Sequence, residues 1–597
     1  MLELPNKRFG RKSAVREAWL RALEKTAPIE ARPGYLLPDA INDLAARFGD
    51  APALLSGSEC LSFCALSEQM NRYARWARAQ GLEKGEAIAL LMPNRPDYMA
   101  AWLGVTRAGG AAALLNTNLK GQSLAHAIRS VATKHLVIAE DLLERFRSAA
   151  PYLEHEPALW VRGTAGGSPF DMDIAGRSGA PLAPLERRDL TIDDRALYIY
   201  TSGTTGLPKA ANVSHRRLMM WSSWFAGMLE TSPRDRMYNC LPMYHSVGGT
   251  VAPGAVLLNG GSVFISEKFS RDAFWSEVTG QGCTLVQYVG ELCRYLVTAP
   301  PHPLERAHKI RAFVGNGLRA DVWESFKERF SIPQLLEFYA ATEGNFSLFN
   351  VEERVGALGR VPPFLSHRFP AALIKHDVET GEPLRDAQGY CVPCDLEEAG
   401  EAIGRIAENA QGGRFEGYSD EAQSEKKVLR DVFVKGDAWY RTGDLMRKDE
   451  DGFFYFVDRI GDTFRWKGEN VSTVEVEEAI ASFPGIAQVG VYGVAVPKTE
   501  GHAGMVAIAC DAALDLEHLR RHIAGRLPPY AAPLFVRLCR ELEITETFKR
   551  KKGALVREGF DPKKISDPLY FDDRASKTYV RLDEALFRRV VNGEIRL

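Results

Sequence analysis

From about residue 35 onward, helical and strand patterns alternate along the chain, and this alternation restricts the possible folds more than any other feature. Residues 67–79 carry apolar side chains at helical spacing, and residues 86–91 form a short apolar run typical of a buried strand. A helical segment at 97–107 and a strand at 111–115 repeat this order. Strands that alternate with helices form mainly parallel sheets covered by helices, so we predict an α/β fold.

The length of the chain predicts more than one domain, because a single hydrophobic core rarely extends over 597 residues. Residues 377–436 are rich in glycine and charge, which favours a β-rich subdomain. At 458–462 a charged segment with a glycine, typical of linkers, precedes a compact series of strands and helices. We therefore predict a large N-terminal domain at 1–458, a hinge at 459–462 and a small, mobile α+β domain at 463–597.

The composition is that of a globular protein with balanced charge. A net charge of −2 argues against nucleic acid as the main partner. The nine cysteines are scattered and odd in number, which predicts no disulfide framework and favours a reducing, cytoplasmic compartment. Cys391 and Cys394 have the spacing of zinc ligands, but no second pair completes a site, so we interpret that spacing as incidental.

Two segments bear on membrane association. Residues 1–7 lack the apolar core of a signal peptide. The uncharged stretch at 249–266 is long enough to span a bilayer, but Pro253, Gly260 and Gly261 interrupt it. We expect a buried helix, a turn and a strand there instead. The chain is predicted to be cytoplasmic, and peripheral contact with the inner face of the plasma membrane is left open.

A run of hydroxyl-bearing residues and glycines directly follows the strand-like residues 196–199. The segment consists of Tyr200, Thr201, Ser202, Gly203, Thr204, Thr205, Gly206, Leu207, Pro208 and Lys209. Small residues let the backbone approach a ligand, and the backbone N–H groups, the hydroxyls and the lysine are donors for phosphate oxygens. The segment is not a P-loop, because its lysine follows a proline and precedes an alanine. It predicts a nucleotide-phosphate site of another type.

This loop resembles the phosphate loop of the adenylate-forming superfamily, which includes acyl-CoA synthetases, luciferase-like enzymes and the adenylation domains of peptide synthetases. The resemblance implies that the chain joins a carboxylate to AMP, releases pyrophosphate and passes the acyl group to a thiol. It also implies ATP, Mg²⁺ and coenzyme A as ligands.

Residues 338–344 resemble a second segment of this superfamily, which lies over the nucleotide. By this resemblance Tyr339 stacks on adenine and Thr342 reaches the α-phosphate. Glu343 holds Mg²⁺ together with Thr204, a role that suits a carboxylate because it is a hard oxygen ligand.

Further segments match the superfamily around the nucleotide. The resemblance implies that Asp444 and Arg459 contact the ribose. It also places a glycine-rich loop beside the adenine and the acyl chain. Gly315, Asn316 and Gly317 form this loop. Lys549 matches the lysine that touches the carboxylate and the α-phosphate during adenylation, although Phe548 stands where the family usually has glycine.

One histidine and four large apolar residues are candidates for the acyl site. His245 lies in a segment, 241–246, that resembles the acyl site of the family, where it is a candidate gate to an acyl tunnel. Four residues after the phosphate loop either line this tunnel or pack in the core; they are Trp221, Trp224, Phe225 and Met228.

Residues 461–477 resemble the signature of the fatty acid transport protein and very-long-chain acyl-CoA synthetase family, as do 415–418, 432–437 and 527–533. The resemblance implies that the C-terminal domain swings about a hinge at Gly461 and Asp462 once acyl-AMP has formed. It also implies that Lys467 and Gly468 then line the channel for the pantetheine arm of coenzyme A.

The leading hypothesis is a ligase that converts long- or very-long-chain fatty acids to acyl-CoA. Its catalytic residues are predicted to be His245, Thr342, Glu343 and Lys549. Two alternatives stay open at this point: a steroid or bile-acid side chain as the substrate, or a transport component at the membrane in which ligation drives uptake. The sequence also leaves the oligomeric state open, a homodimer included.

Overall fold

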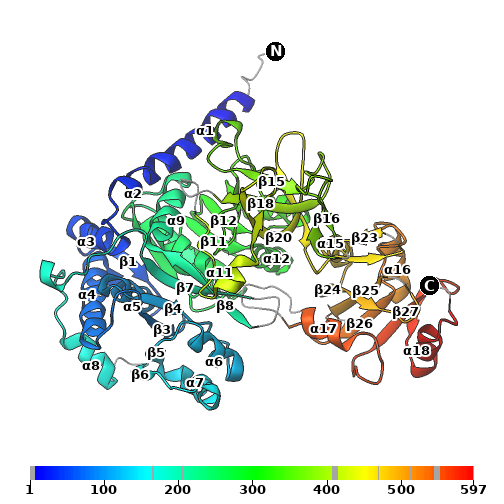
Figure 1. Cartoon of the computed structure of the whole chain (residues 1–597), viewed down its shortest axis with the longest axis horizontal. Coiled ribbons are helices and arrows are strands. Elements are labelled where there is room, and N and C mark those ends of the chain that lie inside the picture. The colour runs from blue at the N-terminus through cyan, green and yellow to red at the C-terminus, as the bar shows by residue number, and fades with distance from the viewer. Residues whose placement is uncertain are drawn as a thin grey trace. The chain divides into compact units, whose positions relative to one another are not determined.

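The computed structural model describes residues 7–163, 167–202, 207–378, 380–406, 414–467, 469–499, 501–510, 514–543, 552–595 and 597. The chain divides into two compact units (Figure 1). The first comprises Met1–Val361 and Ile406–Val428, and the second comprises Pro362–Arg405 and Leu429–Leu597.

The first unit contains a six-stranded sheet in the order β6-β5-β3-β4-β7-β8. Its strands are β3 (Ala87–Leu91), β4 (Ala111–Leu114), β5 (His135–Ala139), β6 (Ala158–Arg162), β7 (Arg195–Ser202) and β8 (Pro208–Ser214). All pairs are parallel except β7 with β8. Every residue of β3 and β4 is buried, as expected for strands of a parallel sheet with helices on its faces.

A second sheet of the first unit has eight strands in the order β14-β13-β12-β11-β9-β10-β1-β2. Its strands are β1 (Pro52–Leu55), β2 (Cys60–Ser62), β9 (Arg236–Asn239), β10 (Ser262–Ile265), β11 (Leu285–Val289), β12 (Ala312–Asn316), β13 (Leu335–Ala340) and β14 (Ser347–Asn350). The central pairs are parallel and the two edge pairs are antiparallel. The parallel strands β12 and β13 carry the predicted loop at 315–317 and Tyr339 at their ends.

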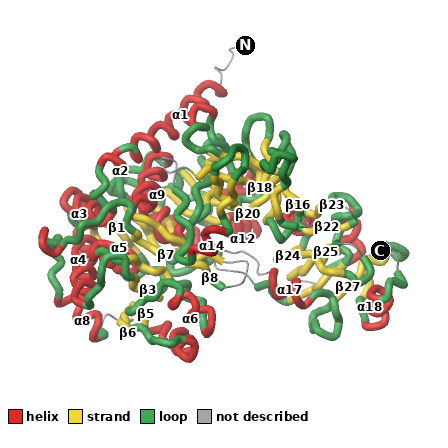
Figure 2. The backbone as a smooth tube through the Cα atoms, viewed as in Figure 1, coloured by secondary structure: helices red, strands yellow, loops and turns green. Residues whose placement is uncertain are grey.

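Helices cover these sheets (Figure 2). They are α1 (Lys7–Thr26), α2 (Pro28–Ala31), α3 (Leu37–Phe48), α4 (Phe63–Ala79), α5 (Pro96–Ala108), α6 (Gly121–Arg129), α7 (Leu143–Ala149), α8 (Pro169–Gly176), α9 (His215–Met228), α10 (Ala252–Leu257), α11 (Phe274–Gly280), α12 (Gly290–Thr298), α13 (Ala320–Phe330) and α14 (Glu421–Glu425). Helix α5 begins at a proline and ends before Gly109, whose φ of 99° is a left-handed conformation that glycine adopts readily.

The N-terminal helix α1 is part of the core of the first unit. Trp19 is 2% exposed and its ring packs edge-on against Trp224 of α9 and Phe349 of β14, with both centroid distances 5.6 Å. Aromatic pairs of this geometry add to the stabilisation from buried apolar area.

The second unit begins with a β-rich subdomain, as the glycine-rich sequence predicts. Its strands are β15 (Ala371–Ile374), β16 (His376–Asp377), β17 (Glu382–Pro383), β18 (Gly400–Ile406), β19 (Val428–Arg430), β20 (Ala438–Lys448) and β21 (Phe454–Arg459). Strands β20 and β21 form an antiparallel pair in which Asp444 is opposite Arg459.

The C-terminal part of the second unit is an α+β structure. A hairpin of β22 (Phe464–Trp466) and β23 (Glu469–Val471) precedes α15 (Thr473–Ala481). A five-stranded sheet follows, with β24 (Ile486–Ala495), β25 (His502–Cys510), β26 (Phe535–Cys539), β27 (Leu569–Asp573) and β28 (Thr578–Arg581). Its helices are α16 (Leu516–Ala524), α17 (Lys552–Glu558) and α18 (Glu584–Val591).

The predicted α/β class is confirmed, including the helix, turn and strand expected within 249–266. There α10 is followed by β10, and the carbonyl of Leu257 accepts a hydrogen bond from the N–H of Gly260 in the turn. Among the described residues, no helix is both long enough and apolar enough to cross a bilayer. The β-rich subdomain groups with the C-terminal residues in the second unit. The predicted domain boundary at 458 and the hinge at 459–462 stay predictions.

Candidate active site

The predicted phosphate loop connects the antiparallel strands β7 and β8. Thr201 is the cross-strand partner of Lys209, and Ser202 is the partner of Pro208, so these pairs bracket the loop. The loop residues Gly203, Thr204, Thr205 and Gly206 lie outside the described residues. The structure therefore describes the two ends of the loop, and the roles of its central residues stay predictions.

Lys209 lies close to Tyr418, a residue to which sequence reasoning assigned no role. Its ammonium nitrogen is 5.6 Å from the centre of the Tyr418 ring. Burial lowers the pKa of Lys209, and the nearby charges of Lys427 and Lys426 lower it further, whereas Glu343 acts in the opposite direction. An anion such as a phosphate would relieve this concentration of positive charge, so the site is suited to a polyphosphate.

Glu343 is buried and bound to the same tyrosine. The Tyr418 hydroxyl donates a hydrogen bond of 2.8 Å to Glu343 Oε1, and only 7% of Glu343 is exposed. The backbone carbonyl of Glu343 also accepts hydrogen bonds from the N–H groups of Glu416 and Gly417, at 3.2 and 3.3 Å. A buried carboxylate needs a donor such as the Tyr418 hydroxyl because burial removes its water. The predicted metal ligand thus has a fixed position next to Lys209.

A network of side chains holds residues 414–418 against β8 and α9. The amide of Asn212 donates to the carbonyls of Glu416 and Tyr418, both at 2.9 Å. The carboxylate of Glu416 accepts from the N–H and hydroxyl of Ser214 at 2.7 and 2.6 Å. Arg217 pairs with Glu416 at 3.3 Å and donates to the carbonyl of Thr342. The network therefore connects β8, the strand that follows the phosphate loop, to the segment that carries Thr342 and Glu343.

The segments of Thr342 and His245 also meet. The hydroxyls of Thr342 and Ser246 are 3.3 Å apart. His245 is half-buried, and its ring centre is 4.7 Å from that of Tyr244. Tyr339 is half-buried and packs edge-on against Phe346. The structure therefore brings three predicted elements into one region of the first unit: the phosphate-loop strands, the 339–343 segment and the 241–246 segment.

The loop at Gly315, Asn316 and Gly317 is tightly packed. A Cβ atom at position 315 would lie 2.1 Å from the carbonyl oxygen of Tyr288, which excludes any side chain there. Gly317 has a φ of 79°, a conformation in which other residues are strained. The N–H groups of Gly317 and Leu318 both donate to Glu337 Oε1, the latter at 3.2 Å. Glu337, for which the sequence predicted no role, therefore fixes this turn.

Four large apolar residues were predicted either to line an acyl tunnel or to pack in the core. Of these, Trp224 and Phe225 pack in the core. Trp224 contacts Trp19, and Phe225 packs edge-on against Phe338 with ring centres 4.8 Å apart. Met228 is 3% exposed. The guanidinium carbon of Arg217 lies 5.8 Å from the ring centre of Trp221, which is half-buried.

The second unit carries the remaining predicted residues. Arg459 Nε is 3.7 Å from Asp444 Oδ1, so the two residues predicted to contact the ribose are neighbours on β20 and β21. Lys467 has a φ of 54° and its ammonium lies 5.8 Å from the Trp466 ring centre. Gly468 and Lys549 lie outside the described residues.

The predicted hinge follows a buried carboxylate. Asp458 accepts hydrogen bonds from the N–H of Arg459 at 2.8 Å and from the N–H and hydroxyl of Thr473 at 2.6 and 3.1 Å. Gly461 has a φ of 94°, and a Cβ atom there would meet nothing within 4 Å. Position 461 thus has a backbone conformation that favours glycine, between two segments that Asp458 holds together.

The comparison with known proteins decides the family. A model described as AMP-binding enzyme matches residues 41–390, and one described as AMP-binding enzyme C-terminal domain matches residues 475–549. The chain is 40% identical over 576 residues to long-chain fatty acid transport protein 1 of Homo sapiens, covering 95% of this chain and 89% of that protein. The chain belongs to the fatty acid transport protein and very-long-chain acyl-CoA synthetase family. Long-chain fatty acid transport protein 2 of Rattus norvegicus is 39% identical over 92% of this chain and 89% of its own length.

Solved structures have the same fold. ATP-bound MatB from Rhodopseudomonas palustris superposes with a TM-score of 0.73 at 23% identity, covering 87% of this chain and 98% of that one. The anthranilate CoA ligase AuaEII in complex with anthranoyl-AMP superposes with a TM-score of 0.72 at 20% identity, covering 87% and 96%. Family membership makes this chain an AMP-forming acid–thiol ligase that uses ATP, Mg²⁺ and coenzyme A.

The residues near Glu343 fit a magnesium ion. Among the described residues no cluster of three or more acidic, histidine or cysteine side chains could hold a metal by itself. Mg²⁺ does not require such a cluster, because it is usually bound by one or two carboxylates together with substrate phosphates and water. Glu343, buried and next to Lys209, supplies a carboxylate of this kind.

We predict that Glu337→Gln changes the pH dependence of stability. Burial raises the pKa of Glu337 to about 8, so the protonated acid is the main form at neutral pH. Because this folded-state pKa lies above the usual value of 4.5, wild-type stability should fall as pH rises from about 4.5 to about 8, by at most ~1.4 kcal/mol per pH unit from this residue. Glutamine keeps the acceptor for Gly317 and Leu318 and places an amide by Tyr288, so the variant should lack this slope. Urea unfolding at pH 5.5, 7 and 8.5 measures the free energy of unfolding of both proteins. The same pH dependence in the wild type and the variant would refute the prediction.

Proposed function

We propose that the chain activates long- or very-long-chain fatty acids, forming acyl-AMP from ATP and then acyl-CoA. The observation that carries this proposal is the 40% identity over 95% of the chain to a protein named for long-chain fatty acid transport. It is supported by the arrangement of Lys209, Tyr418 and Glu343 beside the phosphate-loop strands, which provides one cation and one buried carboxylate for a metal-bound polyphosphate.

In this proposal the residues of the first unit bind and orient ATP. The loop from Thr201 to Lys209 binds phosphate oxygens, Thr342 contacts the α-phosphate, and Tyr339 stacks on adenine. Gly315, Asn316 and Gly317 border the adenine and the acyl chain, and His245 gates the acyl site. Mg²⁺, held by Glu343 and Thr204, would neutralise charge on the phosphate oxygens.

The residues of the second unit complete the reaction in two steps. Asp444 and Arg459 bind the ribose hydroxyls, and the ammonium of Lys549 contacts the carboxylate and the α-phosphate as charge develops between them. The domain at 463–597 then swings about the hinge at Gly461 and Asp462. Lys467 and Gly468 line the path of the coenzyme A thiol in the second step.

We further propose that the protein is cytoplasmic and makes peripheral contact with the inner face of the plasma membrane, where ligation would trap incoming fatty acid. Helix α1 supports this location because its sequence holds more lysine and arginine than aspartate and glutamate, and the cytoplasmic leaflet is anionic.

Tyr418→Phe should raise the Mg²⁺ concentration needed for half-maximal AMP formation by roughly 10-fold or more, because the residues that orient a metal ligand typically contribute 10–100-fold. The variant loses only the hydroxyl that donates to Glu343. Tyr238→Phe is the matched control, since it removes a hydroxyl that donates at 2.7 Å to Glu277, away from this site. Initial rates over a Mg²⁺ series test the prediction, and an equal response of the two variants would contradict it.

Acid-dependent AMP formation should peak with palmitate or a longer acid and require coenzyme A for turnover. The panel is octanoate, palmitate, a very-long-chain acid and cholate. Lys549→Ala should lose roughly 100-fold or more in rate, since it removes a charge that acts in the transition state, whereas Lys564→Ala, at an exposed position of the same unit, should not. Turnover with cholate alone would transfer the assignment to steroid acids. No AMP from any of the acids would overturn the ligase assignment for these substrates.

A further inference from the structure

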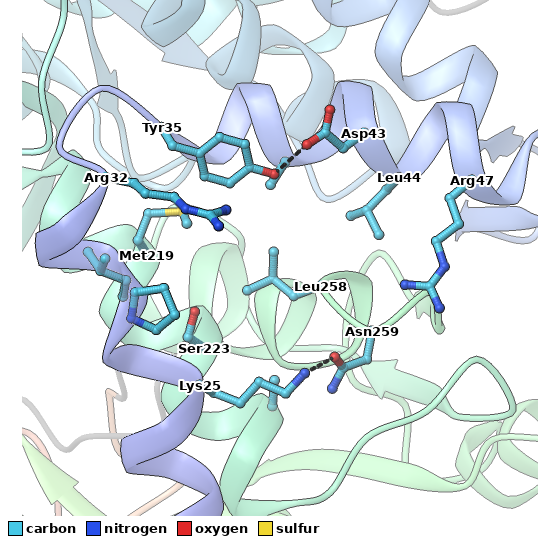
Figure 3. A pocket seen from close by; sticks show the side chains of 14 residues that line it. Lys25, Arg32, Tyr35, Asp43, Leu44, Arg47, Met219, Ser223, Leu258 and Asn259 are labelled. Carbon is cyan, nitrogen blue, oxygen red and sulfur yellow. Dashed lines mark hydrogen bonds between the residues drawn. The ribbon is translucent and has the colours of Figure 1, made fainter.

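An open cavity of about 300 Å³ lies in the first unit, lined mainly by the N-terminal helices and α9 (Figure 3). Its residues come from the end of α1, from α2 and the turn after it, from α3, from α9 and from the two residues that follow α10. The residues of the candidate active site, among them Lys209, Glu343 and Tyr418, do not line it. Lys25, Arg32 and Tyr35 precede residue 41, where the match to the AMP-binding enzyme model begins. The cavity is therefore distinct from the nucleotide site.

The inner part of this cavity is apolar and buried. Ile29, Leu44 and Met219 are between 5% and 7% exposed, and Ala226 is 1% exposed. Leu258 projects into the middle of the space (Figure 3). Such a surface favours an alkyl chain, because each methylene that leaves water contributes to binding.

The outer part is positively charged. Arg32, Arg47 and Lys25 lie on three sides of the opening and are all exposed (Figure 3). One carboxylate, that of Asp43, lines the same opening and accepts a 2.8 Å hydrogen bond from the Tyr35 hydroxyl. The ammonium of Lys25 donates to the Asn259 side chain at 2.7 Å. With three cations and one anion among its lining residues, the opening attracts a negative group.

We propose that this cavity binds an anionic amphiphile: a carboxylate or phosphate head group attached to an alkyl chain. The head group lies among Arg32, Arg47 and Lys25, and the first carbons lie against Leu44, Met219 and Leu258. At ~30 Å³ for each non-hydrogen atom, the space holds about ten such atoms. A longer chain therefore extends out of the cavity. The same chemistry occurs in two sources, a free fatty acid in solution and an anionic phospholipid in a bilayer.

Equilibrium dialysis of the full chain with labelled decanoate and decyl phosphate tests the proposal. A non-hydrolysable palmitoyl-adenylate analogue is present to fill the active site. The expected result is one remaining site per chain for at least one of the two anions. Arg32→Glu combined with Arg47→Glu should weaken binding about tenfold, because each substitution replaces an attraction by a repulsion. Decanol and decyltrimethylammonium, with neutral and cationic head groups, should bind about tenfold more weakly than the anions.

Arg234→Glu is the matched control, since this exposed arginine of the same unit does not line the cavity. It should bind both anions like the wild type. Co-sedimentation with phosphatidylcholine vesicles, with and without phosphatidylglycerol, separates the sources. The bilayer lipid is the ligand if the wild type has no site for the soluble anions and the double variant loses binding to the anionic vesicles. A soluble site with unchanged vesicle binding would identify the free amphiphile.

Two results would overturn the proposal: no remaining site together with unchanged vesicle binding, or decanol binding as tightly as decanoate. The readout is binding at a site outside the ligase centre, so it does not depend on turnover. If the proposed ligase function fails, the adenylate analogue leaves the total number of decanoate sites unchanged, while the effect of the double variant still reports on this cavity.

Discussion

The hydrogen bond from the Tyr418 hydroxyl to Glu343 fixes the candidate active site of the first unit. A carboxylate that is 7% exposed requires a donor, and this donor comes from a segment 75 residues further along the chain. That segment is in turn held by Asn212 and by the ion pair of Glu416 with Arg217. Because Arg217 also bonds the carbonyl of Thr342, the phosphate-loop strands, α9 and the 342–343 segment form one connected polar network. Removal of a single partner leaves a buried charge without compensation, which makes such networks sensitive to substitution.

Much of the fold could be predicted from local patterns. The continuous apolar runs at β3 and β4 indicated buried parallel strands, and the helical segment predicted at 97–107 corresponds to α5. The superfamily motifs led to Glu343, Lys209, Asp444 and Arg459, and the structure places the first two near Tyr418 and the other two opposite each other in a strand pair. These residues could be located because their segments are short and contiguous, so each could be compared as a whole with a motif of the superfamily.

The residues that contact and position them could not be predicted from the sequence in the same way. Tyr418 was noted only as part of a family-like segment, since nothing in its neighbours indicates that it meets Glu343. Glu337 stands between the apolar residues Leu336 and Phe338 of β13, and only the tertiary structure brings the N–H groups of Gly317 and Leu318 to its carboxyl group. This contact forms because β12 and β13 are neighbours in the sheet, and the spacing of residues along the chain does not specify the order of strands. Sequence patterns thus indicated the ligand-contacting candidates better than the residues that position them.

The N-terminal segment precedes the residues matched by the AMP-binding enzyme model, yet it is part of the core of the first unit. Trp19 contacts both Trp224 and Phe349, Phe225 contacts Phe349 and Phe338, and Phe338 directly precedes Tyr339. These ring contacts connect α1 to the strand that carries the predicted adenine-stacking residue. The same helix ends at the cationic cavity, where Lys25 bonds Asn259. Close-packed cores transmit changes in volume to their neighbours, so the position of α1 affects both places. A helix with these contacts is a structural element of the enzyme, because it contributes both to the aromatic core and to the lining of the cavity.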